Sequence, residues 1–123
     1  MKVLVVEPNK KPEVRKIGNG LESMQAVVGG LIEAVYPFDD PVALICNEEG
    51  KITGLPLNRC LRDESGEIID IIAGTFFLCG TPADSDSFTS LTEEQIETNT
   101  ERFAAPEIIL NLGGKILVCS CAG

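Results

Sequence analysis

The stretch IIDIIAGTFFLCG (residues 68–80) is almost continuously apolar, with four isoleucines and two phenylalanines. β-Branched and aromatic residues favour strands, and the small pair Ala73 and Gly74 predicts a break, so we expect one or two strands here. VALIC (42–46) predicts a central strand or one that is buried on both faces. KVLVVE (2–7) predicts another strand near the N-terminus. These stretches indicate a β-sheet at the centre of the fold.

Shorter stretches extend this sheet. EVRKI (13–17) alternates apolar and charged residues, which predicts a half-exposed strand that forms a hairpin with the N-terminal strand. LIEAVYPF (31–38) predicts a further strand. Because Pro56 cannot serve in a central strand, we expect an irregular segment or one helical turn over residues 57–61. The apolar segment 107–123 is expected to add a hairpin strand or to pack against another subunit.

Two segments carry the pattern of amphipathic helices. In the first, Asn19 can cap the helix, with Glu22 three residues later as in a capping box. In the second, Thr92 is the expected cap and Gln95 completes the box. The expected helices span residues 19–29 and 92–104. We therefore predict a single α+β domain over residues 1–123, with an antiparallel or mixed sheet of about five or six strands.

The composition restricts the function. The net charge of −9 argues against direct nucleic-acid binding, because such proteins need basic surface to neutralise phosphates. The absence of histidine excludes Ser-His-Asp and Cys-His catalysis, and we expect a protein that is not an enzyme. No apolar run approaches the ~20 residues of a membrane span, and the N-terminus lacks a signal-peptide pattern. A cytoplasmic protein without membrane contact is therefore expected.

The five cysteines predict reduced thiols, because the count is odd and no secretion signal is visible. Cys46, Cys60 and Cys79 stand among apolar neighbours, and we expect them to be buried as small apolar residues. Cys119 and Cys121 could supply at most two ligands, so a closed zinc site would need a second chain. No metal and no cofactor is expected.

Two arginines, Arg59 and Arg62, lie three residues apart in the apolar stretch LPLNRCLR (55–62). In a helical turn both would emerge on one side, with Asn58 beside them. Because a guanidinium binds phosphate or carboxylate oxygens at two points, these residues are a candidate clamp for a small phosphorylated ligand. The alternative is structural, with both arginines holding loops together through nearby carboxylates. Those carboxylates would be Asp39, Asp40, Asp63 or Glu64.

The turn YPFDDP (36–41) is a second candidate. Tyr36 and Phe38 place aromatic rings beside two carboxylates, in a turn that two prolines make rigid. Such a turn is either a proline-locked structural element or a recognition loop for a base or a ribose ring. The full set of candidate ligand-binding residues is Arg59, Arg62, Asn58, Tyr36, Phe38, Asp39, Asp40 and Thr75.

A family resemblance covers most of the chain, about residues 2–106. VGGLIEAVYPFDDPVALICNEEGKITGLPLNRCLRDESGEIIDIIAGTFFLCG (28–80) and SLTEEQIETNTERF (90–103) closely resemble the family catalogued as domain of unknown function 3846. The strings IEAVYPFDDP, NEEGK, GLPLNR and IIAGTFF are together specific. The resemblance implies an accessory protein of phages, plasmids or conjugative elements, with no general activity attached. The tail GGKILVCSCAG (113–123) departs from the expected family pattern.

This resemblance suggests counter-defence, because small accessory proteins of such elements often have that role. The first expectation is a non-catalytic homo-oligomer in the host-cell cytoplasm, with subunit contacts from the apolar tail. It would bind and sequester a host immune nucleotide signal, such as a cyclic oligonucleotide or an ADP-ribose derivative. The alternative is an acidic protein inhibitor of a host defence nuclease, such as a CRISPR effector or a restriction enzyme. A third expectation is an interaction module that regulates the mobile element itself.

Overall fold

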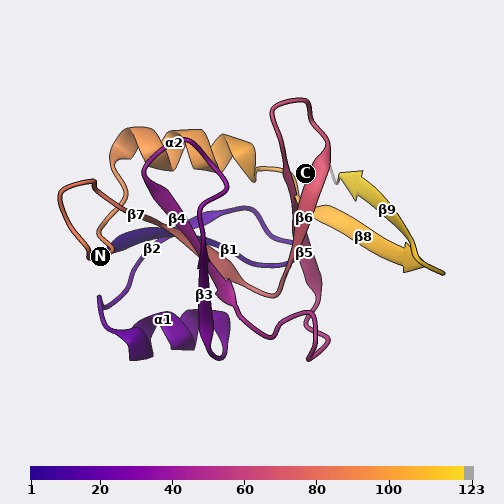
Figure 1. The fold of residues 1–123 in the computed structure, drawn as a ribbon, viewed down its shortest axis with the longest axis horizontal. Helices are drawn as coiled ribbons and strands as arrows, with labels where there is room; N and C mark the ends of the chain where they lie inside the picture. The colour runs from indigo at the N-terminus through magenta and orange to yellow at the C-terminus, as the bar shows by residue number, and fades with distance from the viewer. Residues whose placement is uncertain (121–123) are drawn as a thin grey trace.

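A five-stranded antiparallel sheet with strand order β2-β1-β7-β4-β3 lies at the centre of the fold (Figure 1). The computed structural model describes residues 1–120. Its elements are β1 (Lys2–Val6), β2 (Glu13–Lys16), α1 (Leu21–Val28), β3 (Ile32–Val35), β4 (Val42–Asn47), β5 (Leu57–Arg62), β6 (Ile68–Ala73), β7 (Phe76–Gly80), α2 (Glu93–Arg102), β8 (Glu107–Leu112) and β9 (Lys115–Ser120). The predicted α+β class is confirmed, but the nine strands found in residues 1–120 exceed the number expected.

β1, β4 and β7 are apolar along most of their length, so both faces of the central sheet present apolar side chains that must be covered. Successive side chains of a strand point to opposite faces. Leu4 and Val6 therefore belong to one core cluster, while Val3 and Val5 belong to another. The first cluster includes side chains of α2, β5 and β6, and the second includes side chains of α1. Figure 1 accordingly shows α1 and α2 on opposite sides of the sheet.

Two further antiparallel pairs extend beyond the central sheet. β5 and β6 form a two-stranded ribbon that contributes Leu61 and Ile72 to the core. β8 and β9 form a hairpin that projects from the body of the fold (Figure 1). Gly113 and Gly114 close this hairpin with φ values of 60° and 92°, a left-handed conformation that favours glycine. The hairpin expected in the apolar tail is thus confirmed, while its packing against another subunit stays a prediction.

The segment after Pro56 differs from the prediction. It is the regular strand β5, with four buried residues in its centre, and neither an irregular segment nor a helical turn. Pro56 precedes the strand, so its missing N–H interrupts no ladder. Its carbonyl oxygen instead accepts a hydrogen bond of 2.7 Å from the backbone N–H of Gly74 in the turn between β6 and β7.

One of the two predicted helix caps is confirmed. Thr92 accepts a hydrogen bond from the backbone of Gln95, whose side chain accepts one from the backbone of Thr92, so α2 begins with a full capping box. The predicted Asn19 cap is wrong. Gly20 precedes α1 and makes no side-chain cap bond, while Asn19 Oδ1 accepts a hydrogen bond of 3.2 Å from the amino group of Met1.

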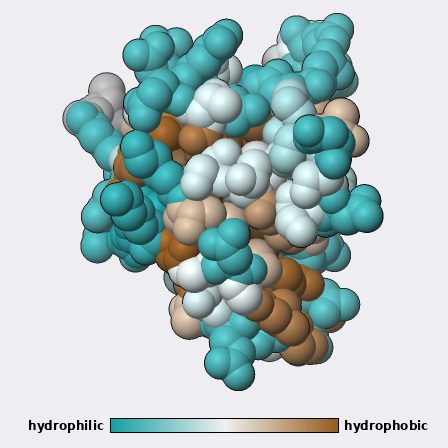
Figure 2. All heavy atoms as spheres, turned by 90° about the vertical axis from the view of Figure 1, so that its left-hand side faces the viewer, coloured by the Kyte–Doolittle hydropathy of each residue, from teal (hydrophilic) through white to brown (hydrophobic). Residues whose placement is uncertain are grey.

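The surface of the fold is largely polar on the side shown in Figure 2, where hydrophilic side chains surround smaller apolar areas. Among residues 1–120, no helix combines the length and the apolar character needed to cross a bilayer.

Three cysteines are buried, as predicted: Cys46, Cys60 and Cys79. Burial raises the pKa of the Cys79 thiol to about 12 and that of Cys46 to about 11, and it also raises the pKa of Cys60. Because the thiolate is the reactive form, these three groups are protonated and shielded at neutral pH. Cys119 is exposed on β9, and Cys121 lies outside the described residues.

We expect the folded Cys121→Ser variant to titrate with a disulfide reagent such as DTNB as a protein with one accessible thiol, that of Cys119. Unfolding in guanidinium should release the three buried thiols for reaction. The control is the Cys119→Ser, Cys121→Ser double variant, which should be inert while folded. Rapid reaction of that control would contradict the burial of the core cysteines.

Candidate functional site

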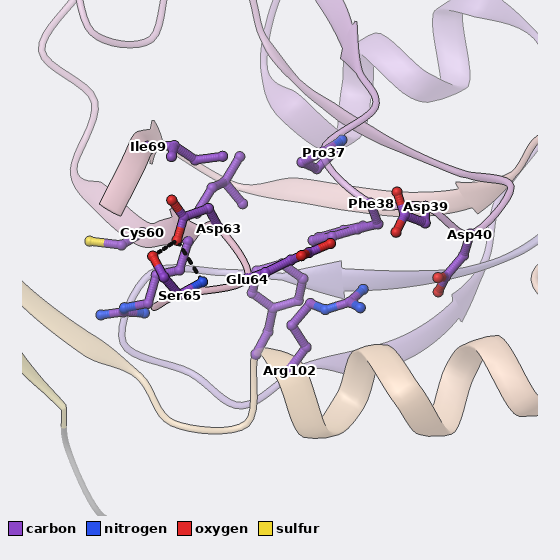
Figure 3. A pocket seen from close by; sticks show the side chains of 13 residues that line it. Pro37, Phe38, Asp39, Asp40, Cys60, Asp63, Glu64, Ser65, Ile69 and Arg102 are labelled. Carbon is purple, nitrogen blue, oxygen red and sulfur yellow. Dashed lines mark hydrogen bonds between the residues drawn. The ribbon is translucent and has the colours of Figure 1, made fainter. Parts of the chain in front are cut away.

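A cavity of about 780 Å³ opens between three segments: the YPFDDP turn after β3, the turn between β5 and β6, and the C-terminal end of α2 (Figure 3). Its volume lies within the ~300–1,000 Å³ usual for small-ligand sites. Its wall is formed by Pro37, Phe38, Asp39, Asp40, Cys60, Leu61, Arg62, Asp63, Glu64, Ser65, Ile69, Arg102 and Phe103. It is the candidate functional site.

The turn between β5 and β6 is fixed by Asp63. Its Oδ1 atom accepts hydrogen bonds from the backbone N–H and the hydroxyl of Ser65, at 2.9 and 2.7 Å (Figure 3). It also accepts one from the backbone N–H of Glu67, at 3.0 Å. This arrangement is an Asx turn. The hydrogen bonds, led by that of the Ser65 side chain, lower the pKa of Asp63 from its ordinary value. The Asp63 carboxylate therefore stabilises the turn in which it lies.

Phe38 and Phe103 form the aromatic part of the wall, with ring centroids 6.1 Å apart in an edge-to-face arrangement. The guanidinium carbon of Arg102 lies 3.7 Å from the centroid of the Phe38 ring, which is a cation–π contact. Arg102 Nη1 also donates a hydrogen bond of 2.7 Å to Asn99 Oδ1. The end of α2 thus holds Arg102 against the YPFDDP turn.

Arg62 contributes the second guanidinium of the cavity and is paired with Glu107 of β8. Arg62 Nη2 lies 2.9 Å from Glu107 Oε2, and Glu107 Oε1 accepts a hydrogen bond of 3.1 Å from the backbone N–H of Cys60. The Glu107 side chain is only 6% exposed. Its hydrogen bond raises the pKa of Arg62 above the ordinary value. The charge of Arg62 is therefore balanced within the protein.

Arg59 is 1% exposed and does not line the cavity. Its Nε and Nη2 atoms donate to the carbonyl oxygen of Phe103, at 3.3 and 3.2 Å, and Nη2 also donates to the carbonyl oxygen of Lys10 at 2.6 Å. Nη1 donates to the carbonyl oxygen and to Oδ1 of Asn58, at 3.3 and 2.8 Å. Burial lowers the pKa of Arg59. All three nitrogens are thus engaged inside the protein, and none is free for a phosphate.

Asn58 completes this buried polar group. Its Nδ2 donates hydrogen bonds of 2.8 Å to the carbonyl oxygen of Val6 and 2.9 Å to that of Gly74. The pairing of β5 with β6 shifts register between Leu57 and Arg59. Such a bulge interrupts the regular alternation of side chains, and both Asn58 and Arg59 are buried. The Asn58–Arg59 pair has a structural role in this arrangement.

The two arginines therefore do not form the predicted clamp on a helical turn: Arg59 faces the interior and Arg62 the cavity. The structural alternative is wrong about the partners. Arg62 pairs with Glu107 instead of Asp39, Asp40, Asp63 or Glu64, and Arg59 binds backbone carbonyls and Asn58.

Four of the candidate ligand-binding residues line the same cavity: Phe38, Asp39, Asp40 and Arg62. Tyr36 is 61% exposed and lies outside the cavity wall, as does the half-buried Thr75 between β6 and β7. Sequence reasoning missed Arg102 as a site residue. Its place in the last turn of the second helix was visible, but its contact with Phe38 exists only in the tertiary structure.

The uncompensated charge of the cavity is negative. Its wall contains four carboxylates and two guanidiniums. Within residues 1–120, Asp39, Asp40 and Glu64 make no ion pair, whereas Arg62 is bound to Glu107 and Arg102 is stacked on Phe38. In the same part of the chain, no three cysteine or carboxylate side chains are grouped to hold a metal ion. The arrangement suits a cationic group beside the carboxylates of Asp39, Asp40 and Glu64.

Glu107, the buried member of its ion pair with Arg62, should stabilise the folded protein against unfolding. We expect Glu107→Gln to lower the free energy of unfolding by about 1–2 kcal/mol, because the amide keeps an acceptor for Cys60 but loses the charge-assisted bond to Arg62. Glu101→Gln is the matched control on an exposed position of α2 and should stay within about 0.5 kcal/mol of the wild type. Equal urea midpoints for both variants would contradict this role of Glu107.

Comparisons with known proteins give a family and no characterised relative. No curated protein and no solved structure matches the chain. A family described as Domain of unknown function (DUF3846) matches residues 1–104, which confirms the resemblance found in the sequence and leaves the β8–β9 hairpin outside the matched region. The protein belongs to the DUF3846 family.

Proposed function

We propose that this protein is a non-catalytic binding protein whose cavity receives a basic side chain of a partner protein. The observation that carries the proposal is the charge of the cavity: Asp39, Asp40 and Glu64 make no ion pair within residues 1–120, while both arginines of the wall are engaged. A guanidinium or ammonium entering there would gain charge-assisted hydrogen bonds from carboxylates. Ile69, which is exposed and lines the cavity, adds apolar surface for the alkyl stem of that side chain.

The partner class that fits this surface is a protein with a basic groove for DNA. Such grooves neutralise phosphates with lysine and arginine side chains, and a chain of net charge −9 can compete for them electrostatically. The proposal therefore favours the inhibitor of a defence nuclease, with a CRISPR effector or a restriction enzyme as the expected target. We also propose that the protein is encoded by a phage or another mobile element.

Sequestration of a nucleotide signal is supported less well by the same contacts. Phosphates would need guanidinium donors, but Arg59 is buried and Arg62 is bound to Glu107. The Phe38 ring already has Arg102 stacked on it, so a base could not replace that contact without moving Arg102. Three carboxylates that are not ion-paired would repel an anionic ligand at short range.

The test is inhibition of plasmid cleavage by a panel of restriction endonucleases and CRISPR effector nucleases. For a target that the wild type inhibits, we expect the Asp39→Asn, Asp40→Asn, Glu64→Gln triple variant to weaken inhibition about tenfold or more, as the loss of three contacts of ~0.5–1 kcal/mol implies. Inhibition should also weaken as salt is raised. The matched control is Glu94→Gln, Glu97→Gln, Glu101→Gln on α2, which removes the same charge from exposed positions and should have a much smaller effect.

Two results would contradict the proposal. One is equal loss of inhibition in the cavity variant and the α2 variant, because the total charge would then act without the cavity. The other is a rise in melting temperature with a cyclic oligonucleotide or ADP-ribose species that the cavity variant abolishes, together with no inhibition of any nuclease in the panel. That pair of results would favour sequestration of a nucleotide.

A further inference from the structure

The β8–β9 hairpin gathers apolar side chains on one of its faces. Its register places Ile108 opposite Cys119 and Leu110 opposite Leu117. Residues paired across an antiparallel ladder share a face, and Leu112 shares it because it follows Leu110 by two residues. Lys115, which pairs with Leu112, lies at the tip end of the same face. Ile108, Leu110, Leu112 and Leu117 are here called the hairpin face.

The hairpin face is open to solvent within the described chain. Its four side chains are between 46% and 57% exposed. Of the twelve large hydrophobic side chains that are exposed among residues 1–120, five lie in this hairpin, with Ile116 as the fifth. A two-stranded hairpin is at best marginally stable by itself in water, and contiguous exposed apolar surface marks an interaction site. β8 already contacts β5 through Glu107, so the hairpin face is the part of the hairpin that is left for an interaction.

The distribution of charge indicates which partner can cover it. All nineteen acidic residues of the sequence lie at or before Glu107, and residues 108–120 carry a single charged side chain, that of Lys115. Two copies of this acidic chain repel each other wherever their carboxylates approach within the screening length of ~8–10 Å. The hairpin is a surface on which two copies can touch without that repulsion. It offers a basic partner no carboxylate to bind.

We propose that the protein forms a homodimer in which the hairpin faces of two copies pack against each other about a two-fold axis. Such an interface uses the same patch on both subunits. The pair Leu110 and Leu117 lies in the middle of the ladder and so occupies the centre of the contact. No residue of the hairpin lines the candidate cavity, so the dimer is independent of the proposed nuclease inhibition.

The test is sedimentation equilibrium of the full chain and two charge-matched variants. The wild type should sediment as a dimer of the 13.2 kDa chain. Leu110→Glu, Leu117→Glu places carboxylates at the centre of the contact and should raise the dissociation constant about 100-fold or more, as loss of ~3 kcal/mol implies. Leu21→Glu, Leu31→Glu changes two equally exposed leucines elsewhere and should leave the dimer intact.

A cross-linking measurement covers the case in which the glutamate variant fails to fold. In a Cys121→Ser background, Cys119 is the exposed thiol of the described chain and lies on the hairpin face. A flexible bis-maleimide should then give a covalent dimer at dilute protein concentration, and Cys119→Ser should abolish it. The proposal would be overturned if the wild type were monomeric at all concentrations. It would also be overturned if a folded Leu110→Glu, Leu117→Glu variant remained a dimer.

Discussion

The buried guanidinium of Arg59 joins parts of the fold that are far apart in the sequence. A charge removed from water must be hydrogen-bonded in full, and here the oxygens that meet this need come from distant parts of the chain. Phe103 follows α2, Lys10 lies between β1 and β2, and Asn58 is itself bound to the end of β1 and to the turn between β6 and β7. One side-chain pair thus joins the central sheet, the β5–β6 ribbon and the end of α2.

This use of Arg59 shapes the chemistry of the cavity beside it. Because the interior engages one guanidinium of LPLNRCLR and Glu107 engages the other, the four carboxylates of the cavity wall outnumber its cations, of which Arg102 alone makes no ion pair within residues 1–120. An acidic cavity on an acidic chain favours basic protein partners over phosphates. The hairpin of β8 and β9 has the opposite character, apolar and without carboxylates. In the two proposals, the cavity is the surface for a basic partner and the hairpin face is the surface for a second copy.

The sequence predicted the features that depend on neighbouring residues. The central strands follow from continuous apolar runs, and the Thr92 cap of α2 follows from a pattern four residues long. β5 was mispredicted because Pro56 was expected to disrupt a strand that in fact begins just after it. The role of Arg59 could not be predicted, since its carbonyl partners at Lys10 and Phe103 meet it only in the folded chain. The acidic turn was visible in the sequence, whereas its position opposite Arg102 was not.

Arg59 stabilises the fold from the interior and is not available to bind a ligand. Urea unfolding of Arg59→Met tests it most directly, with Arg15→Met as a control that removes the same charge from a surface ion pair. Because Met leaves the carbonyl oxygens of Lys10 and Phe103 and Oδ1 of Asn58 without their buried donor, Arg59→Met should lower the free energy of unfolding by about 2–3 kcal/mol, against at most ~1 kcal/mol for the control. Equal stability of the two variants would contradict it.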